Sequence, residues 1–332
     1  MRNLLPLMLL LLIVSCKSES KQELKPNSEP ITITSDEIKE IVSYLASNEL
    51  KGRHAGSEGI EKAASYIESQ FKSFGIKPYY ETYRDHFRID SLDINAFNVI
   101  GVIEGNDAIL KKEAIILGAH YDHIGFGSDA RRKSRKGSIT ETDSIANGAN
   151  DNASGTSAVV AMSRYFAETK TNKRTIIFAL FSAEELGLLG SKHLAQRLKS
   201  ENLNLYSMVN FEMIGVPFKD RDYEAFVSGY HLSNMAAKMN EYAGNNLIGY
   251  SEVAKKYTLF KKSDNYPFYE QFNLPSQTIS SCDLSNYDYY HHGDDEISEL
   301  DYKFMASLIN KTISVIETMS NTPTKEIAMY EE

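Results

Sequence analysis

Five segments of the 332-residue chain place histidine or acidic residues at the ends of apolar runs, where they could do chemistry. The first is AIILGAHYDH, residues 114–123, in which the apolar run leads into His120, Asp122 and His123. Imidazole suits zinc, and a carboxylate two residues later can bond the second ring nitrogen of His120 and fix its orientation. Taken alone, such a pair more often marks a polar turn, and we interpret His123 as a turn residue.

Two further segments offer carboxylates just before predicted helices. In NGANDNASGTSAVVAM, residues 147–162, Asp151 could either cap the helix or bridge two cations. In IIFALFSAEELGLLGS, residues 176–191, Ser182 and Glu185 match a capping box, an alternative that leaves Glu184 unexplained. Adjacent residues at a strand-to-helix turn project in different directions. One glutamate could therefore ligate a metal while the other serves as a base, which is the division that metal-assisted hydrolysis needs.

The last two segments complete a ligand set. In MVNFEMIG, residues 208–215, Glu212 interrupts an apolar strand, where a carboxylate is costly to bury unless it is paired or bound to a metal. In NYDYYHHGDDE, residues 286–296, Tyr290 precedes His291 and His292. Together the five segments supply enough nitrogen and oxygen ligands for two zinc-like ions, with one glutamate to spare.

The elements that must position these residues follow from hydrophobic periodicity. Continuous apolar runs predict strands at 98–103, 114–119, 175–181, 208–211, 225–228 and 277–279. Helical spacing predicts helices at 38–45, 60–74, 157–168, 186–198, 232–242 and 297–319. Strands without alternation indicate a sheet covered on both faces, and intervening helices indicate parallel crossovers. We therefore expect a three-layer α/β/α fold with a mixed, mostly parallel twisted sheet, whose functional residues gather at the carboxyl ends of the strands.

The charge and the chain organisation narrow the function further. A net charge of −9 argues against nucleic acid as a partner. The basic run at 131–136 lies in an aperiodic loop, residues 126–148, and we interpret it as solvated rather than as a binding patch. We expect a single domain at residues 31–320 and a polar C-terminal tail at residues 321–332.

The N-terminus predicts export. Residues 1–15 contain an apolar stretch that is too short for a membrane span and fits a signal peptide. Ser15 before Cys16 resembles the bacterial lipobox, in which the cysteine is lipidated. The alternative is an ordinary signal peptide with an incidental cysteine. Residues 16–30 are polar and predict a flexible tether. If Cys16 is acylated, Cys282 is the only thiol left, so no intrachain disulfide can form. We expect an exported lipoprotein anchored through Cys16, in the outer membrane of a Gram-negative bacterium and facing the periplasm or the cell surface.

The motifs resemble a known family. GAHYDH, NGANDNASG, SAEELGLLGS, NFEMIG, SDNYPF and YYHHGDD occur in the order found in bacterial di-zinc aminopeptidases related to aminopeptidases S and Y. The upstream segment NELKGRHAGSEG is also similar, and the resemblance covers roughly residues 38–315. It implies the zinc exopeptidase fold, which glutaminyl cyclases share, and peptide substrates with free N-termini.

The resemblance also implies roles for individual residues. Two zinc ions per chain would bind, with Asp151 bridging them, and would activate a bridging water. Glu184 would be the general base, Asp122 the partner of His120, and Tyr290 a donor to the developing oxyanion. Asp264 of SDNYPF would help to shape the pocket. The first zinc ion would be held by His120, Asp151 and Glu212, and the second by Asp151, Glu185 and His291.

The chain departs from the family at three places. Glu212 stands where many members have aspartate, and Asn265 replaces a common histidine. His292-Gly293 replaces a usual Thr-Pro pair, and we prefer His291 to His292 as the ligand because two aspartates follow it at the expected spacing. The alternatives to an aminopeptidase are a glutaminyl-peptide cyclase, a carboxypeptidase and a non-catalytic ectodomain. The intact NDNASG segment and the lack of tryptophan argue against the cyclase.

Overall fold

The computed structural model describes residues 31–126, 133–134, 137–138 and 144–331. The predicted signal peptide, the whole of the predicted tether and most of the basic loop lie outside these residues. Residues Thr32–Glu332 form one compact unit. Within the described residues, no helix is both long enough and apolar enough to span a bilayer.

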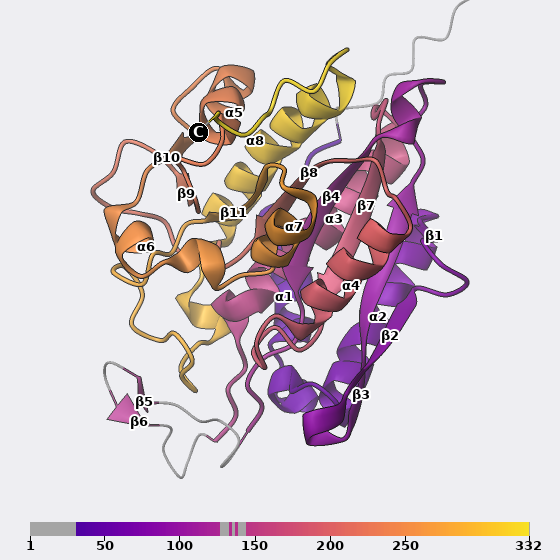
Figure 1. The fold of residues 1–332 in the computed structure, drawn as a ribbon. Coiled ribbons are helices and arrows are strands. Elements are labelled where there is room, and N and C mark those ends of the chain that lie inside the picture. Colours follow the sequence, from indigo (N-terminus) through magenta and orange to yellow (C-terminus); the bar gives the residue numbers. More distant parts are fainter. Residues whose placement is uncertain (1–30, 127–132, 135–136, 139–143, 332) are drawn as a thin grey trace, which may run out of the picture. The chain divides into compact units, whose positions relative to one another are not determined.

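The centre of this unit is a nine-stranded mixed sheet in the order β1-β3-β7-β4-β8-β11-β9-β10, with β2 also paired to β3 (Figure 1). The four central strands β7, β4, β8 and β11 are mutually parallel, whereas β3 joins β7 in antiparallel fashion. The strands are β1 (Lys77–Pro78), β2 (Arg84–Ile89), β3 (Ile94–Ile103), β4 (Ala114–His120), β7 (Thr175–Phe181), β8 (Leu205–Phe211), β9 (Ala225–Val227), β10 (Ile248–Gly249) and β11 (Ser276–Ser280). A separate two-stranded pair is formed by β5 (Lys133–Ser134) and β6 (Gly137–Ser138).

Helices cover both faces of the sheet, as expected for three layers. The helices are α1 (Ser35–Leu45), α2 (Glu58–Phe74), α3 (Gly155–Thr169), α4 (Leu189–Ser200), α5 (Met235–Ala243), α6 (Glu252–Lys256), α7 (Asn265–Phe272) and α8 (Tyr302–Asn321). One apolar cluster joins the sheet to α1, α2, α3, α5 and α8, and a second joins its other face to α4 and α7. In Figure 1, α4 and α7 lie on the viewer's side of the sheet.

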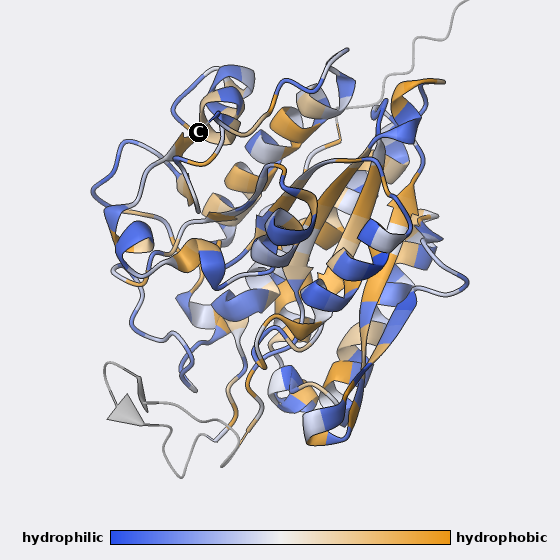
Figure 2. Cartoon of the chain, in the orientation of Figure 1, coloured by the Kyte–Doolittle hydropathy of each residue, from blue (hydrophilic) through white to orange (hydrophobic). Residues whose placement is uncertain are grey.

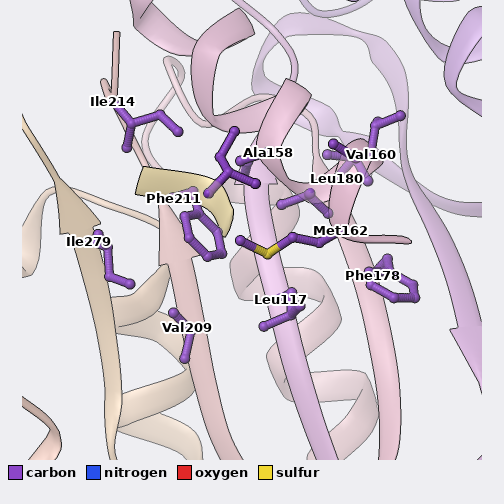
Figure 3. Packing of buried hydrophobic residues seen from close by; sticks show 14 of the residues in the cluster. Leu117, Ala158, Val160, Met162, Phe178, Leu180, Val209, Phe211, Ile214 and Ile279 are labelled. Atoms are coloured by element: carbon purple, nitrogen blue, oxygen red, sulfur yellow. The ribbon is translucent and has the colours of Figure 1, made fainter. Parts of the chain in front are cut away.

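Strand β4 shows why the sheet is buried on both sides. Ile115 and Leu117 belong to the larger cluster, and Ala114 and Ile116 belong to the smaller one. The central strands are accordingly among the most hydrophobic parts of the chain (Figure 2). Figure 3 shows Leu117 among the side chains that pack α3 against the larger face. Burial of this apolar area is the main stabilising term of the domain.

The prediction of fold class is confirmed, and several boundaries differ. The predicted helix at 186–198 begins at Leu189, because Leu188 has a positive φ of 62°. The capping box that Ser182 and Glu185 could have formed is therefore absent, since no helix starts there. Helix α1 begins three residues before its predicted start, and Thr34 caps it by accepting the Glu37 amide. Strands β1, β2 and β10 and helices α6 and α7 were not predicted.

The C-terminal segment packs against the domain. Ile327 is buried, and its amide donates to the Tyr206 hydroxyl over 3.0 Å. Met329 forms a bridge with Ser233 near the start of α5. The expected polar tail thus carries an apolar anchor.

Candidate metal centre

The predicted site residues meet at one edge of the sheet, beyond the carboxyl ends of parallel strands. His120 is the last residue of β4, and Glu212 directly follows β8. Glu184 and Glu185 lie in the turn after β7, and Asp151 lies in the short helical turn Ala149–Ser154 that leads into α3. His291 comes from the loop between β11 and α8. The arrangement follows from topology, because parallel strands end at the same edge.

Four of these side chains form a compact group, which we call the four-residue cluster. Its members are His123, Asp151, Glu185 and His291, and their ligand atoms all lie within 4.8 Å of one another. His291 Nε2 lies 2.9 Å from Asp151 Oδ2 and 2.9 Å from Glu185 Oε1. His123 Nδ1 lies 3.0 Å from Glu185 Oε1. Among the described residues this is the only such group.

The expected turn role of His123 is wrong. His123 is fully buried within the cluster rather than solvated at a turn. By contrast, His292 lies outside the cluster, and its Nδ1 accepts the Asp294 amide over 3.0 Å. The structure therefore brings His291 to the site that the sequence predicted and adds a histidine that the sequence analysis had set aside.

The other predicted ligands lie beside the cluster. His120 Nε2 is 3.3 Å from Asp151 Oδ1, so Asp151 contacts histidines on both of its oxygens. The Glu212 carboxylate accepts a hydrogen bond from Ser263 and is not a member of the compact group. His120, Asp151 and Glu212 are thus neighbours, without the tight convergence seen in the four-residue cluster.

The Asn residues that flank Asp151 hold its loop in place. Asn150 Oδ1 accepts the Gly215 amide over 2.9 Å, and Asn152 Oδ1 accepts the Met213 amide over 3.1 Å. Both bonds tie the Asp151 loop to the segment that follows Glu212. The Asp151–Asn152 peptide bond is cis. Asp151 therefore does not act as a helix cap but is presented to the cluster by its neighbours.

Two buried aspartates orient the ligand-bearing backbone. Asp122 Oδ1 accepts the Glu184 amide over 3.2 Å, and the His120 ring lies closer to the Asp122 carbonyl, at 3.2 Å, than to its carboxylate, at 3.7 Å. Asp295 accepts the amides of Asn150 at 2.7 Å and Asp151 at 3.0 Å. Asp122 thus fixes the glutamate turn as well as His120. Asp295, which the sequence analysis did not single out, fixes the Asp151 loop.

A buried arginine clamps the same loops from behind. Arg53 is 1% exposed, and it donates to the carbonyls of Tyr121 at 2.9 Å, Asn147 at 2.6 Å and Gly148 at 3.0 Å, and also to that of Leu45. Burial lowers the pKa of Arg53 to about 10, and nearby carboxylates partly offset this, so the guanidinium stays charged at neutral pH. Arg53, in the segment NELKGRHAGSEG, is therefore a positioning residue for these loops.

Electrostatics favour a cation at this edge. Burial raises the pKa of Glu212 to about 8 and that of Asp264 to about 7, and neighbouring carboxylates add to both effects. Burial likewise raises the pKa of Glu185, with Asp151 contributing. The negative charge of these neighbouring carboxylates therefore exceeds the positive charge that the nearby imidazoles can supply. A divalent cation would remove this repulsion, and a mixed imidazole and carboxylate set suits zinc.

A cavity of about 100 Å³ opens beside Glu212 and Tyr290. Tyr290 is 38% exposed and stacks on His291 with ring centroids 3.7 Å apart. The remaining lining is partly apolar and partly hydroxyl-bearing, from Met213, Phe226, Ser228, Leu259, Lys262, Ser263, Thr278, Ser280, Cys282 and Leu284. The cavity therefore offers room for a side chain next to the candidate metal ligands.

The three-layer fold and the candidate ligands define a metal-binding α/β/α protein, and comparison with known proteins agrees. Residues 98–316 match Peptidase family M28, so the chain belongs to this family. A probable zinc metalloprotease from Leptosphaeria maculans is 24% identical over 71% of this chain and 56% of its own length. A probable leucine aminopeptidase from Trichophyton verrucosum is 27% identical over 68% of this chain and 57% of its own length. The chain thus spans little more than half the length of these curated relatives.

Solved structures share the fold. The LapA aminopeptidase of Legionella pneumophila superposes with a TM-score of 0.63 at 22% identity, covering 87% of this chain and 73% of LapA. The glutaminyl cyclase of Porphyromonas gingivalis superposes with a TM-score of 0.65 at 14% identity, covering 86% of this chain and 98% of the cyclase. The expected zinc exopeptidase fold is confirmed, and it is common to both kinds of enzyme.

Proposed function

We propose that the protein is a zinc-dependent aminopeptidase that removes N-terminal residues from peptides. The observation that carries the proposal is the convergence of His120, Asp151, Glu185 and His291 at one sheet edge, with Glu184 adjacent and a side-chain cavity alongside. The names of the curated relatives support the same activity. The chain's resemblance to bacterial di-zinc aminopeptidases supports two ions, with His120, Asp151 and Glu212 holding one and Asp151, Glu185 and His291 the other.

Zinc bound at these residues would supply Lewis acidity, which polarises a carbonyl and lowers the pKa of water. The chain's own residues do the rest. Glu184 lies outside the four-residue cluster. The Glu184 carboxylate is therefore available as a base. It accepts a proton from the attacking water as the oxygen bonds to the scissile carbonyl carbon. The same proton then passes to the leaving amine as the C–N bond breaks.

The size and lining of the cavity support a preference for certain N-terminal residues of the substrate. Its volume of about 100 Å³ is smaller than the roughly 150 Å³ that holds a benzene ring in an engineered protein core. Its walls combine Met213 and Phe226 with hydroxyls such as Ser228 and Thr278. Small and medium aliphatic N-terminal residues therefore fit better than aromatic ones. Tyr290 lines the same cavity, and the family resemblance supports its hydroxyl as a donor to the carbonyl oxygen.

A peptide panel scored by mass spectrometry tests the activity. One set of peptides carries free alanine, leucine, phenylalanine or glutamine at the N-terminus, and a matched set is acetylated. We expect stepwise loss of N-terminal residues from the free peptides, fastest for alanine and leucine, and no cleavage of the acetylated set. Loss of ammonia from the glutamine peptides without cleavage would instead establish the cyclase activity that the shared fold permits. Release of C-terminal residues would establish a carboxypeptidase.

Removal of metal gives the second arm of this test. Dialysis against a chelator should abolish cleavage, and added zinc should restore it. Full cleavage by protein shown to be free of metal would contradict the proposal.

A further inference from the structure

His123 is placed to do more than fill space. It is fully buried, and its Nδ1 approaches Glu185 Oε1 to 3.0 Å and Asp151 Oδ2 to 4.0 Å. Among the described residues, neither of its ring nitrogens has a hydrogen-bond partner of acceptable geometry. A buried polar atom without a hydrogen bond destabilises the fold, so an imidazole with two such atoms needs an explanation.

The backbone around His123 provides a slot that fixes the ring. The His123 amide donates to the Arg53 carbonyl over 3.3 Å. Gly148 has a φ of +61°, and a Cβ there would lie 2.6 Å from Cγ and Cδ2 of the imidazole. Because the Cδ2 edge faces Gly148, the Nδ1 edge is turned toward the carboxylates. Only glycine leaves room for the ring in this orientation.

The distances between the four ligand atoms bracket those expected in a coordination shell. Zinc–ligand bonds of about 2.0–2.2 Å in a tetrahedron place neighbouring ligand atoms about 3.3–3.6 Å apart. His291 Nε2 is 2.9 Å from each of its two carboxylate neighbours, and His123 Nδ1 is 3.0 Å and 4.0 Å from the same two oxygens. The two imidazoles thus flank the same pair of carboxylates, with ring centroids 5.6 Å apart.

We propose that His123 is a direct ligand of the ion held by Asp151, Glu185 and His291, so that this site has two imidazoles while the site of His120 and Glu212 has one. The inference rests on the proposed function only in taking zinc as the ion. A second imidazole strengthens binding of zinc relative to oxygen-preferring ions such as magnesium. The two sites are therefore unequal, and the four-residue cluster fills first.

Zinc titration tests whether the two sites differ in their affinity for zinc. Metal-free wild type, His123→Ala and the control His86→Ala are titrated with zinc against a chromophoric chelator. His86 is an exposed histidine on β2. We expect His123→Ala to weaken the tighter binding step more than 100-fold, beyond the 10- to 100-fold typical of groups that only orient a ligand. The weaker step and the His86→Ala protein should be unchanged. An unchanged tighter step in His123→Ala would overturn the proposal.

Cobalt substitution tests direct ligation without relying on a variant. In the cobalt-loaded wild type, each coordinated imidazole gives one hyperfine-shifted, exchangeable N–H proton resonance. We expect three, from His120, His123 and His291, and two in His123→Ala or, if that protein does not fold, in His123→Gln. Two resonances in the wild type would overturn the proposal. Three resonances in a protein that cleaves no peptide would support His123 as a ligand and refute the aminopeptidase function. Two resonances in a protein that does cleave peptides would support the aminopeptidase function and refute His123 as a ligand.

Discussion

At the scale of single residues, Glu184 and Glu185 show how adjacent side chains divide two tasks. Both amides are held by the Asp122 carboxylate, at 3.2 Å and 3.4 Å, but only Glu185 joins the four-residue cluster. A carboxylate that is engaged with a cation is a poor base, because the cation stabilises its charged form. In the proposed mechanism, proton transfer is therefore assigned to Glu184.

This division predicts the behaviour of Glu184→Gln. The amide keeps the shape of the side chain but cannot accept the proton, so kcat should fall by about 10²- to 10⁴-fold. The zinc content, measured by elemental analysis, should equal that of the wild type. Glu40→Gln, on the exposed face of α1, is the matched control and should retain full turnover. Wild-type turnover in Glu184→Gln would place the base elsewhere.

The limits of sequence reasoning are also clearest at this scale. His120, Glu212 and the two glutamates could be predicted because each one interrupts or ends an apolar run. Asp151 could be predicted because it stands just before a predicted helix. His123 could not, because its position depends on the conformation of Gly148, which is 25 residues away in the chain. The second histidine of GAHYDH was the available signal, and spacing alone does not distinguish a buried ligand from a turn residue.

At the scale of elements, the loops of the site are held by groups that lie behind it. Arg53 donates to four backbone carbonyls, two of them in the segment that leads to Asp151. Buried carbonyls left without a donor cost about 1–3 kcal/mol each. The clamp thus links the start of the domain to the metal centre.

Removing this clamp should therefore cost stability. We expect Arg53→Ala to lower the free energy of unfolding by about 3–5 kcal/mol, measured by urea denaturation of the metal-free protein. Arg53→Lys keeps the charge but donates fewer hydrogen bonds. Its free energy of unfolding should lie between those of the wild type and Arg53→Ala. The exposed Arg88, replaced by alanine, is the control. Equal stability of wild type and Arg53→Ala would show that the carbonyls find other donors.

A second element-scale network predicts a pH dependence. The buried Asp85 of β2 accepts from Arg197 at 2.6 Å and Asn98 at 3.1 Å, and it contacts His193 at 3.2 Å. Burial alone would raise the pKa of Asp85, but these partners outweigh it and hold the pKa below the usual value. Asn98 also accepts the Ser182 amide, so the network reaches the glutamate turn.

Because the folded-state pKa of Asp85 is depressed, its contribution to stability is present above the unfolded pKa of about 4 and is lost as the pH falls below it. Asp85→Asn should lower the free energy of unfolding at pH 7 by about 1–2 kcal/mol, a modest value because Arg197 is 39% exposed. Its unfolding free energy should also fall less steeply below pH 4. Asp220→Asn, at an exposed position, should follow the wild-type profile. Parallel curves for Asp85→Asn and wild type would contradict this account.

The elements differ in how well the sequence foretold them. Thr175–Phe181 was predicted to the residue, because a strand buried on both faces is continuously apolar. β2 was missed, since three of the six residues in RDHFRI are charged and the strand is stabilised by pairing to β3. α7 was missed because Pro267 near its start and its aromatic content suggest a loop. Tertiary contacts, rather than local periodicity, decide such elements.

At the scale of the whole molecule, we expect the domain and the N-terminal segment to have separate roles. The described fold begins at Ile33, whose amide donates to Asn310 of α8 over 2.9 Å, and α1 follows directly. Within the part of the chain that the structure describes, every residue of the four-residue cluster lies after this point. Peptidase activity should therefore depend on the domain alone, and cellular location should depend on the segment that precedes it.

The lipobox-like sequence around Cys16 gives this separation a direct test. In a Gram-negative host supplied with labelled palmitate, we expect the wild-type chain to incorporate label and to sediment with membranes. Cys16→Ala should lose both properties, because Cys16 is the residue expected to carry the acyl chains and these chains would hold the protein on the membrane. Cys282→Ala is the matched control: this buried thiol is not available for acylation, so its loss should leave labelling unchanged. Peptide cleavage by Cys16→Ala should match that of the wild type. Label retained in Cys16→Ala would refute the anchor, whereas lost cleavage would show that the N-terminal segment supports the site.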